Sequence, residues 1–452
     1  MDKKEKQEYL FQEAGVWKAI SRMAIPAMVS ILVMLIYNMA DMFFVGQLGD
    51  TAQVAAVSLV GPVFTLMMAI GTMIGGGGSV LTAKTLGEKD FEKVKLCSSL
   101  CCWSSIVLGL LFSAVVLLFS NPLLRFLGAD SNTFYLAKQY MTILALGAPI
   151  TIFANGFGNV IRGEGAVKEG MVGHLLGTLV NIVLDPLFIL VLRMGVGGAA
   201  VATVLGNVTA ALYFLVYIKK SNTNLTLQPS YAKKQPSAII QILALGLPNM
   251  INSTLAGFAG AFANQLLARY GTNAVAAMGA AGKSTLIISM IQMGLCMGVQ
   301  PLMAYNYGAK NMPRIKEVLA KLSILTVTTG LSATIFCLFN SRMMIALFLK
   351  EPEALALGQQ MVTLLILSGP FLGLFYIGSN FLQASGNALL ATIVSMLRQG
   401  VFLIPLLYAM NALFGVTGNI IVHIIADITA AAVAIVLALQ QYGKLKRSCE
   451  TP

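Results

Sequence analysis

The chain has 452 residues, of which 57% are hydrophobic and 11% are charged, and its mean hydropathy is +0.80. Soluble globular domains carry roughly 25% charged residues, so this composition excludes a cytosolic enzyme or a free DNA-binding domain and indicates a protein whose main solvent is lipid. The formal net charge of +12 does not indicate a nucleic-acid partner, because the basic residues lie mainly in short gaps between apolar stretches.

The N-terminal segment 1–15 is polar and charged, and the apolar run that follows it is too long for the core of a cleaved signal peptide. We therefore predict that this run is retained as the first membrane span.

The cysteines lack the regular spacing of a secreted disulfide framework, so we interpret them as small buried hydrophobic residues. They are Cys97, Cys101, Cys102, Cys296, Cys337 and Cys449.

Apolar stretches of about 20 residues recur along the whole chain, and each is long enough to cross a bilayer as a helix. We predict an all-α polytopic membrane protein with twelve transmembrane helices. The expected ranges are 17–45, 52–82, 97–120, 133–161, 169–192, 196–218, 238–268, 274–305, 318–341, 353–383, 388–411 and 415–441.

The distribution of Lys and Arg predicts how these spans are oriented. Basic residues gather at the N-terminus, in the even-numbered gaps between spans and at the C-terminus, whereas the odd-numbered gaps hold few. Because cytoplasmic loops are enriched in Lys and Arg, we expect both termini to be cytoplasmic, in a multi-pass protein of the plasma (inner) membrane. The even number of spans agrees with this orientation.

The second half of the chain resembles the first half at one fixed shift along the sequence. Gly87, Lys89, Lys95, Pro149, Asn159 and Gly165 coincide with Gly308, Lys310, Lys316, Pro370, Asn380 and Gly386. These matches are not of the kind that apolar composition alone supplies, so we predict two six-helix lobes, 1–225 and 226–452. Six is an even number, so both lobes enter the membrane in the same direction. We expect a pseudo-two-fold axis along the membrane normal, as in carriers built from parallel repeats.

Three acidic residues, Asp41, Asp185 and Asp427, lie well within apolar spans. A carboxylate at that depth is costly and usually marks an ion or substrate pathway. Helical rise places Asp41, Asp185 and Thr203 roughly 9–12 Å below the outer surface, and Asn181 shares a helical face with Asp185. Oxygen ligands suit a small cation such as Na⁺, and paired carboxylates also favour a proton. We predict a cation-coupling site at these four residues.

The predicted coupling site belongs to the first lobe only. At the shift that relates the two halves, Phe262, Phe402 and Leu406 stand opposite Asp41, Asn181 and Asp185. The alternative interpretation is that each of these acids merely forms a hydrogen bond to a neighbouring helix.

A second pair of titratable residues lies in the last span, where His423 precedes Asp427 by one turn. This pair is either a second proton site or a tether between helices. Arg398 and Lys283 also lie within late spans. Lys283 either counters a carboxylate or extends its ammonium group to the membrane surface, and the sequence does not choose.

Two further patterns limit the function. The segment 279–285 resembles a phosphate-binding loop, but Ala277 stands where the first glycine is required and no strand precedes it, so we do not predict ATP binding. The chain lacks HExxH, GxSxG and comparable hydrolase motifs, so we expect no enzymatic activity.

The four glycines of segment 75–78 permit either close helix packing or a hinge.

Taken together, these residues resemble the multidrug and toxic compound extrusion (MATE) family, in the branch of DinF-like and MepA-like bacterial exporters. The resemblance covers nearly the whole chain. It is carried by Ile25–Pro26, Tyr37–Asp41 and Val45–Gly46 in the first span, Arg162–Gly165 after the fourth, Asn181–Pro186 in the fifth and Ala426–Asp427 in the last.

This resemblance implies twelve helices in two lobes around a cleft, and export of organic cations in exchange for inward Na⁺ or H⁺. The cation-site pattern of the family falls on the four predicted coupling residues. Tyr37, Asn155 and Asn159 are then expected to be their neighbours or to line the substrate cavity. The carboxylate pair that NorM-like members carry in the carboxy-terminal lobe is missing from this sequence.

We therefore predict a secondary-active multidrug efflux antiporter, associated with antibiotic resistance, that exports amphiphilic, cationic organic compounds. We expect a monomer in the lipid bilayer that needs H⁺ or Na⁺ but no cofactor and no nucleic acid. A flippase for a lipid-linked sugar is one alternative, which a cluster of cavity arginines would favour, and Arg398 is nearly alone. A receptor or scaffold, the alternative from another class, requires neither paired deep acids nor a repeat.

Overall fold

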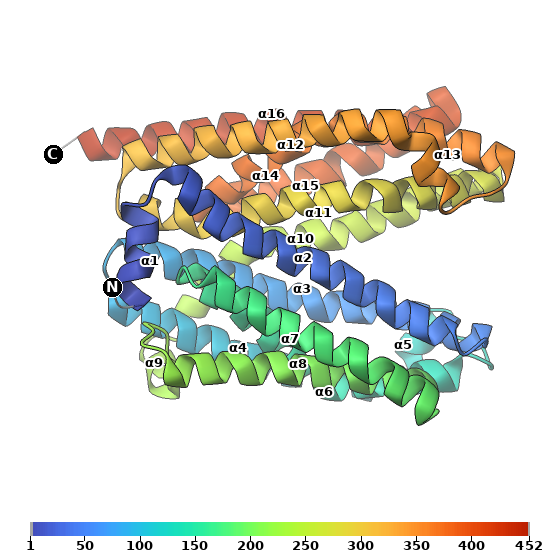
Figure 1. Ribbon diagram of the computed structural model, residues 1–452, viewed down its shortest axis with the longest axis horizontal. Coiled ribbons are helices and arrows are strands. Elements are labelled where there is room, and N and C mark those ends of the chain that lie inside the picture. Colours follow the sequence, from blue (N-terminus) through green and yellow to red (C-terminus); the bar gives the residue numbers. More distant parts are fainter. Residues whose placement is uncertain (1–2, 451–452) are drawn as a thin grey trace. The chain divides into compact units, whose positions relative to one another are not determined.

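The computed structural model describes residues 3–450, apart from the side chains of residues 3–4, 37–39, 42 and 448–450. Every regular element in this part of the chain is a helix (Figure 1). Contacts divide the chain into two compact units. Unit 1 comprises residues 1–13 and 29–246, and unit 2 comprises residues 14–28 and 247–452.

The boundary between the units passes through two helices, α2 (Val16–Gly46) and α10 (Ala238–Leu267), each of which contributes to both units. The other helices of unit 1 are α1 (Lys3–Gln12), α3 (Thr51–Gly87), α4 (Phe91–Leu118), α5 (Ser120–Phe126), α6 (Phe134–Gly163), α7 (Val167–Pro186), η1 (Leu187–Val191), α8 (Gly195–Lys220) and α9 (Pro229–Lys234). Those of unit 2 are η2 (Ala268–Tyr270), α11 (Thr272–Gly308), α12 (Met312–Ala346), α13 (Pro352–Leu365), η3 (Ile366–Ser368), α14 (Gly369–Ala384), α15 (Ala388–Met396), η4 (Leu397–Phe402) and α16 (Leu403–Glu450).

The predicted spans correspond closely to these helices. The described residues contain eleven apolar helical stretches that are long enough to cross a membrane. The last stretch has 60 residues, 388–447, and contains Gly415 with φ 60° and ψ −136°. That conformation suits only glycine and interrupts the helix, so this stretch makes the eleventh and twelfth crossings. The all-α prediction of twelve spans is confirmed, with the short helices α1, α5 and α9 as additions.

In unit 1, α6 is the central helix and packs against α3, α4, α7 and α8. Glycines allow the closest approach: a Cβ atom on Gly75 of α3 would lie 2.5 Å from the carbonyl oxygen of Gly156 on α6. A Cβ atom on Gly78 would lie 2.4 Å from Sγ of Cys101 on α4. These glycines therefore serve close helix packing, the first of the two roles that the sequence left open.

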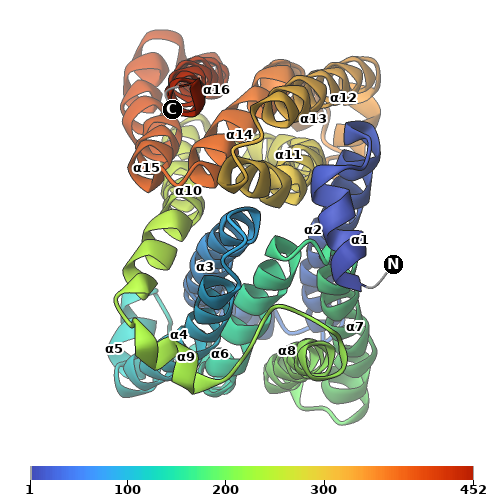
Figure 2. The ribbon, with the colours of Figure 1, turned by 90° about the vertical axis from the view of Figure 1, so that its left-hand side faces the viewer.

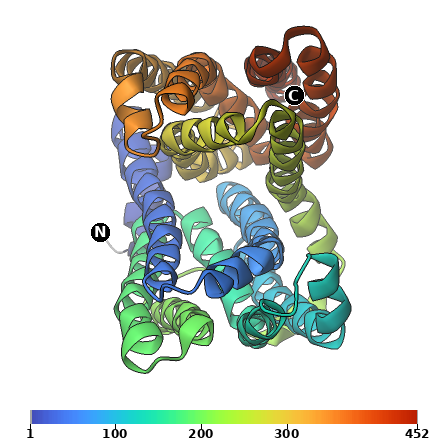
Figure 3. The same ribbon diagram turned by 90° about the vertical axis from the view of Figure 1, so that its right-hand side faces the viewer.

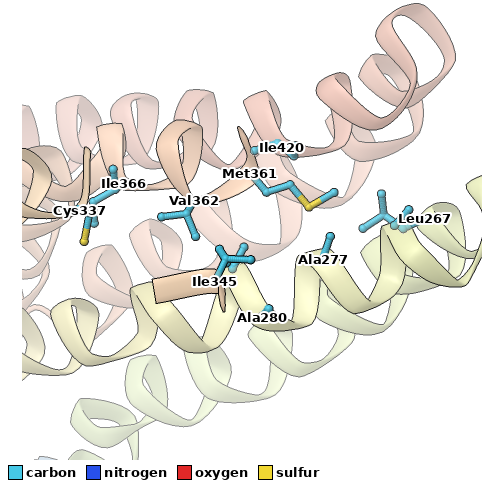
Figure 4. Close-up of a cluster of buried hydrophobic side chains, with 11 residues drawn as sticks. Leu267, Ala277, Ala280, Cys337, Ile345, Met361, Val362, Ile366 and Ile420 are labelled. Atoms are coloured by element: carbon cyan, nitrogen blue, oxygen red, sulfur yellow. The ribbon is translucent and has the colours of Figure 1, made fainter. Parts of the chain in front are cut away.

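In unit 2, α14 packs against α11, α12, α15 and α16. A buried apolar cluster fills the space between helices at the end where α11 begins (Figure 4). It includes Ala277 and Ala280 of α11, Cys337 and Ile345 of α12, and Met361 of α13, all of them almost fully inaccessible to solvent. Cys337 is thus a small buried hydrophobic residue, as predicted.

Equivalent backbone features recur in the two units at the shift predicted from the sequence. Lys89 and Lys310 both have positive φ values, 58° and 52°, which are uncommon for residues with a side chain. Gly165 and Gly386 have φ values of 92° and 86°. Since each pair ends a helix in the same way, the internal repeat is a repeat of three-dimensional structure.

Two side-chain contacts also repeat at this shift. A Cβ atom on Gly109 would lie 2.4 Å from Cα of Pro149, and one on Gly330 would lie 2.8 Å from Cα of Pro370. A hydrogen bond lies beside each of these contacts. The hydroxyl of Ser113 on α4 donates to the carbonyl oxygen of Ala145 on α6, and the hydroxyl of Thr334 on α12 donates to the carbonyl oxygen of Ile366.

Candidate functional site

The core of the candidate site lies at the end of α7, where the helix changes its winding. Asp185 is fully buried in the last turn of α7, and Asn181 lies one turn earlier with 1% of its surface exposed. Pro186 has no backbone N–H, and the π-helix η1 follows it at once. Such π turns are often found at functional sites. The amide of Asn181 donates to Oδ1 of Asp185 over 3.4 Å.

Asp41 meets this group from α2, in the part of that helix that belongs to unit 1. Its side chain is buried, and the Asp185 carboxyl lies within hydrogen-bonding reach of the Asp41 carboxyl. Two carboxylates at this separation, shielded from water, cannot both keep their full charge without a cation or proton between them. The structure therefore brings together two acids that lie far apart in the sequence.

Thr203 enters the site from α8, which lies beside the antiparallel helix α7 in unit 1 (Figures 2 and 3). A Cβ atom on Gly206 would lie 2.6 Å from the carbonyl oxygen of Gly177 and 3.1 Å from Cβ of Asn181. Thr203 lies almost one turn before Gly206, and Asn181 lies one turn after Gly177. Because the helices run in opposite directions, Thr203 stands level with Asn181, and only 1% of its surface is exposed.

Two oxygen atoms of the site are poised to accept a further ligand. Oδ1 of Asn181 and Oδ2 of Asp185 are buried, and no N–H or O–H donor in the described part of the chain reaches either atom. Buried acceptors without a donor are costly. Carboxylate and amide oxygens in this arrangement fit a proton or a small hard cation such as Na⁺.

Tyr140 of α6 is a neighbour of the acid pair that the sequence analysis missed. It is buried and interacts electrostatically with both Asp41 and Asp185. A tyrosine within an apolar run looks like a core residue, which is why it was overlooked. Depth in the membrane is the signal that could have identified Tyr140. It lies seven residues inside the predicted span 133–161, or about 10 Å below the outer surface. Thr203 was assigned the same depth.

Of the two asparagines expected near the site, Asn155 joins α6 to α3, whereas Asn159 bonds within α6. The amide of Asn155 donates to the carbonyl oxygen of Met68 over 3.1 Å, and the amide of Asn159 donates to the carbonyl oxygen of Asn155 over 2.9 Å. Tyr37 lies on α2, but its side chain is outside the described part of the structure. A substrate-lining role for these three residues stays a prediction.

In unit 2, Asp427 has a partner that the sequence analysis did not assign. Nε of Arg398, on the π-helix η4, lies 2.7 Å from Oδ1 of Asp427 on α16, and both side chains are nearly buried. The guanidinium group also lies 4.8 Å from the centre of the Phe375 ring. His423 lies one turn before Asp427, and no partner among the described residues reaches its buried Nε2 atom.

Comparison with known proteins identifies the class to which this fold and site belong. The family model MatE matches residues 26–187 and 236–409. The chain therefore belongs to the MATE family of membrane transporters, and the family expectation is confirmed.

Particular relatives agree with this assignment. The multidrug export protein MepA of Staphylococcus aureus (strain MSSA476) is 34% identical over 435 residues, which cover 96% of each chain. MepA of Staphylococcus saprophyticus is 31% identical over the same share of each chain.

Solved structures with the same fold include a MATE protein in complex with MaL6 and the outward-facing conformation of a multidrug resistance MATE family transporter. Their TM-scores are 0.91 and 0.90, each at 26% identity. The first match covers 98% of this chain and 99% of that one, and the second covers 97% and 98%. The predicted architecture of twelve helices in two lobes is thus confirmed.

Proposed function

We propose that this protein is a multidrug efflux antiporter of the cell membrane, which exports amphiphilic organic cations in exchange for H⁺ or Na⁺. The MepA relative from Staphylococcus aureus is a multidrug export protein, and its 34% identity over nearly the whole chain supports this proposal. Asp41, Asn181, Asp185 and Thr203 bind the coupling ion.

The observation that carries this proposal is the contact between the buried carboxyls of Asp41 and Asp185. In the state with no ion bound, the pair is negatively charged and surrounded by apolar helices. A bound proton or Na⁺ removes that charge, so ion binding changes which local arrangement of α2, α7 and α8 has the lowest free energy. A charge change within the membrane is what coupling to an ion gradient requires.

We expect a proton to bind at the centre of the pair. Two carboxyl groups form a hydrogen bond with each other only when one of them is protonated, whereas Na⁺ needs several oxygen ligands at once. Oδ1 of Asn181 and Oδ2 of Asp185 supply two of these ligands. We therefore expect H⁺ to be the principal coupling ion and Na⁺ to compete for the same oxygens.

Pro26 provides a position at which α2 can bend when an ion binds. It lies inside the helix, about four turns before Asp41, and removes one hydrogen bond from its backbone. The helix is assigned to unit 2 up to Met28 and to unit 1 from Val29 onward. We expect α2 to change its bend near Pro26 when the acids are neutralised, which would lower the affinity for an organic cation attracted by their charge.

An equilibrium titration tests this proposal. The fluorescence of an organic cation such as ethidium is followed as it binds purified protein in detergent, at several pH and Na⁺ values. Linkage requires the ion and the organic cation to weaken each other by the same factor. We expect affinity for ethidium to fall as pH decreases and more weakly as Na⁺ increases. An affinity that is indifferent to both ions in the unmodified protein would refute the coupling mechanism.

The role of the His423–Asp427 pair as a second proton site remains a proposal beside this one. Arg398 gives Asp427 a counter-charge, which favours the tether interpretation, whereas the unpartnered Nε2 atom of His423 favours a proton. A flippase for a lipid-linked sugar would need arginines that are free to bind its substrate. Arg398 is already paired with Asp427, and this supports the antiporter over the flippase.

A further inference from the structure

A groove lies between α11 and α12, within unit 2, and none of its lining residues belongs to the acid pair. Its volume is about 540 Å³, which is within the range of small-molecule sites, roughly 300–1,000 Å³. Ile287 and Ile288 of α11 and Phe336 and Met344 of α12 form much of its apolar wall. Ile287 and Phe336 are about half exposed, so the groove opens to the surface of the unit.

Three of the four hydroxyl groups that line this groove are already engaged in hydrogen bonds. Ser284 donates to the carbonyl oxygen of Ala280 over 2.9 Å. Thr328 and Thr329 donate to carbonyl oxygens one turn earlier in α12, each over 2.7 Å. Because these groups are satisfied within their own helices, the surface they present to an occupant is mainly that of their methyl and methylene groups. The groove therefore suits a hydrocarbon chain.

The cationic side chain of Lys283 stands at one end of the groove. Lys283 precedes Ile287 by one turn of α11, and its ammonium nitrogen lies 5.9 Å from the centre of the Phe348 ring. Phe348 in turn follows Met344 by four residues, so Lys283 and Phe348 close the end at which α11 begins and α12 ends. Of the two roles considered for Lys283, the structure shows extension toward the end of the helix pair.

No acidic residue in the described part of the chain forms an ion pair with Lys283. Glu351 and Glu353, the acids at this end of unit 2, accept hydrogen bonds from the amide of Asn273 over 3.5 and 3.2 Å. The length of α11, 37 residues, corresponds to about 55 Å, against a hydrocarbon core of about 30 Å. Lys283 lies eleven residues after the start of α11, or about 16 Å, and a lysine side chain that extends toward that end of the helix carries its ammonium group toward the lipid headgroups.

We propose that this groove binds an anionic phospholipid, with one acyl chain between α11 and α12 and the headgroup phosphate against Lys283. Charge complementarity selects this occupant, because the lysine attracts a phosphate and repels the organic cations proposed as exported substrates. Apolar burial holds the chain, and the charge provides preference among lipids.

Native mass spectrometry of delipidated protein tests the site, with dioleoyl phosphatidylglycerol and dioleoyl phosphatidylcholine as probes. We expect Lys283→Gln to weaken phosphatidylglycerol binding about fivefold, the effect of one basic residue on an anionic lipid, and to leave phosphatidylcholine binding unchanged. Lys350→Gln, at an exposed lysine of the same unit that does not line the groove, is the matched control. Ala333→Phe fills the groove and should weaken binding of both lipids.

Three outcomes would overturn the proposal. The first is an unchanged preference for phosphatidylglycerol in Lys283→Gln, and the second is an equal loss in Lys350→Gln. The third is that Ala333→Phe abolishes ethidium binding while both lipids still bind, which would assign the groove to an organic substrate. Circular dichroism and size-exclusion chromatography establish that each variant is folded. Because the readout is lipid binding, this test is independent of whether the protein proves to be an antiporter.

Discussion

The buried acids of this protein are stabilised in two different ways at the residue scale. Asp41 and Asp185 lie within hydrogen-bonding reach of each other, with Asn181 donating to Asp185. Asp427 forms an ion pair with Arg398. The first arrangement needs an external cation or proton to neutralise it, whereas the second is neutral as it stands. Under the proposed function, this difference leads us to expect that the Asp41–Asp185 pair responds to an ion gradient.

Replacing either acid of the pair by its amide should abolish gradient-driven efflux. Asp41→Asn and Asp185→Asn keep the shape of the side chain but remove the charge that ion binding neutralises. Dye efflux from proteoliposomes under separately imposed pH and Na⁺ gradients measures the effect. Asp50→Asn is the matched control, because Asp50 is exposed and caps α3 by accepting from Ala52, a role that Asn fills equally well. Normal efflux by both site variants at matched protein levels would show that the acids are structural.

The Arg398–Asp427 pair should behave as a structural tether. Arg398→Gln or Asp427→Asn alone leaves one buried charge unpaired, which costs about 3–5 kcal/mol in other proteins. The double variant leaves no charge, so we expect it to be more stable than either single variant. Thermal unfolding in detergent measures the three stabilities. If Asp427→Asn were instead neutral for stability and shifted the pH dependence of efflux, Asp427 would be a proton site.

At the scale of the elements, the helices approach one another most closely where glycines face backbone atoms. Gly75 touches α6 in this way, whereas a Cβ atom on Gly61, earlier in α3, would meet nothing within 4 Å. The same substitution should therefore have clearly different effects at two positions of one helix.

Gly75→Ala should lower the free energy of unfolding by about 1–3 kcal/mol, because the added methyl group would separate α3 from α6. Gly61→Ala should change it by less than about 1 kcal/mol, because the added methyl group meets no neighbouring helix, and the better helix propensity of alanine is offset by the proline that follows, Pro62. Denaturant or thermal unfolding of the two variants in the same detergent measures both. Equal effects at the two positions would contradict the close crossing of α3 and α6.

The repeat offers a second matched pair at the start of α4 and α12. Asp90 accepts from the backbone N–H of Lys93, and Asn311, at the equivalent position of the second repeat, accepts from that of Arg314. Hydrogen bonds from Lys93 lower the pKa of the Asp90 carboxyl below its ordinary value of 3.8. Stability from a lowered pKa is present above the unfolded value and is lost as pH falls through the folded value.

Ala substitution at Asp90 should thus destabilise the protein by about 1 kcal/mol at pH 7, the usual effect of a lost cap. The difference should shrink as pH falls below about 4, where the carboxyl becomes protonated. Asn311→Ala should have a similar effect at all pH values, because an amide does not titrate. Unfolding curves at pH 7 and pH 3 measure both, and an effect of Asp90→Ala that persists unchanged at pH 3 would contradict the assignment.

At the scale of the whole molecule, the chain is a tandem repeat in which only one half carries the acid pair. The two units share caps, glycine contacts and hydroxyl contacts at the same shift. The proposed ion site therefore depends on the side chains placed on a duplicated scaffold, since Phe402 and Leu406 stand in the second half where Asn181 and Asp185 stand in the first.

The distribution of positive charge predicts the orientation of this repeat in the membrane. Ser230 on α9 should be cytoplasmic and Asp50 should be outside. In intact cells, a membrane-impermeant thiol reagent should label Asp50→Cys and leave Ser230→Cys unlabelled. Both should react after permeabilisation, which serves as the control for accessibility. The opposite labelling pattern would show that the topology is the reverse of the predicted one, and the proposed direction of transport would then be wrong as well.

The amino-acid order alone was enough to predict the helical class, the approximate ends of the spans, the repeat and the acids that lie within apolar spans. The physical reason is the solvent, because a backbone surrounded by lipid must satisfy its hydrogen bonds within each span and therefore forms helices whatever its tertiary contacts. Charge and helical rise then predict depth, and depth alone placed Asp41, Asp185 and Thr203 at one level of the membrane.

Only the tertiary structure decided which side chains are partners. Arg398 and Asp427 lie on different helical elements, Tyr140 joins the acid pair from α6, and Lys283 extends beside a groove instead of meeting a carboxylate. Such contacts depend on the rotation of each helix about its own axis. A span that is apolar on every side carries little periodic signal for that rotation, so it is set by the packing of neighbouring helices.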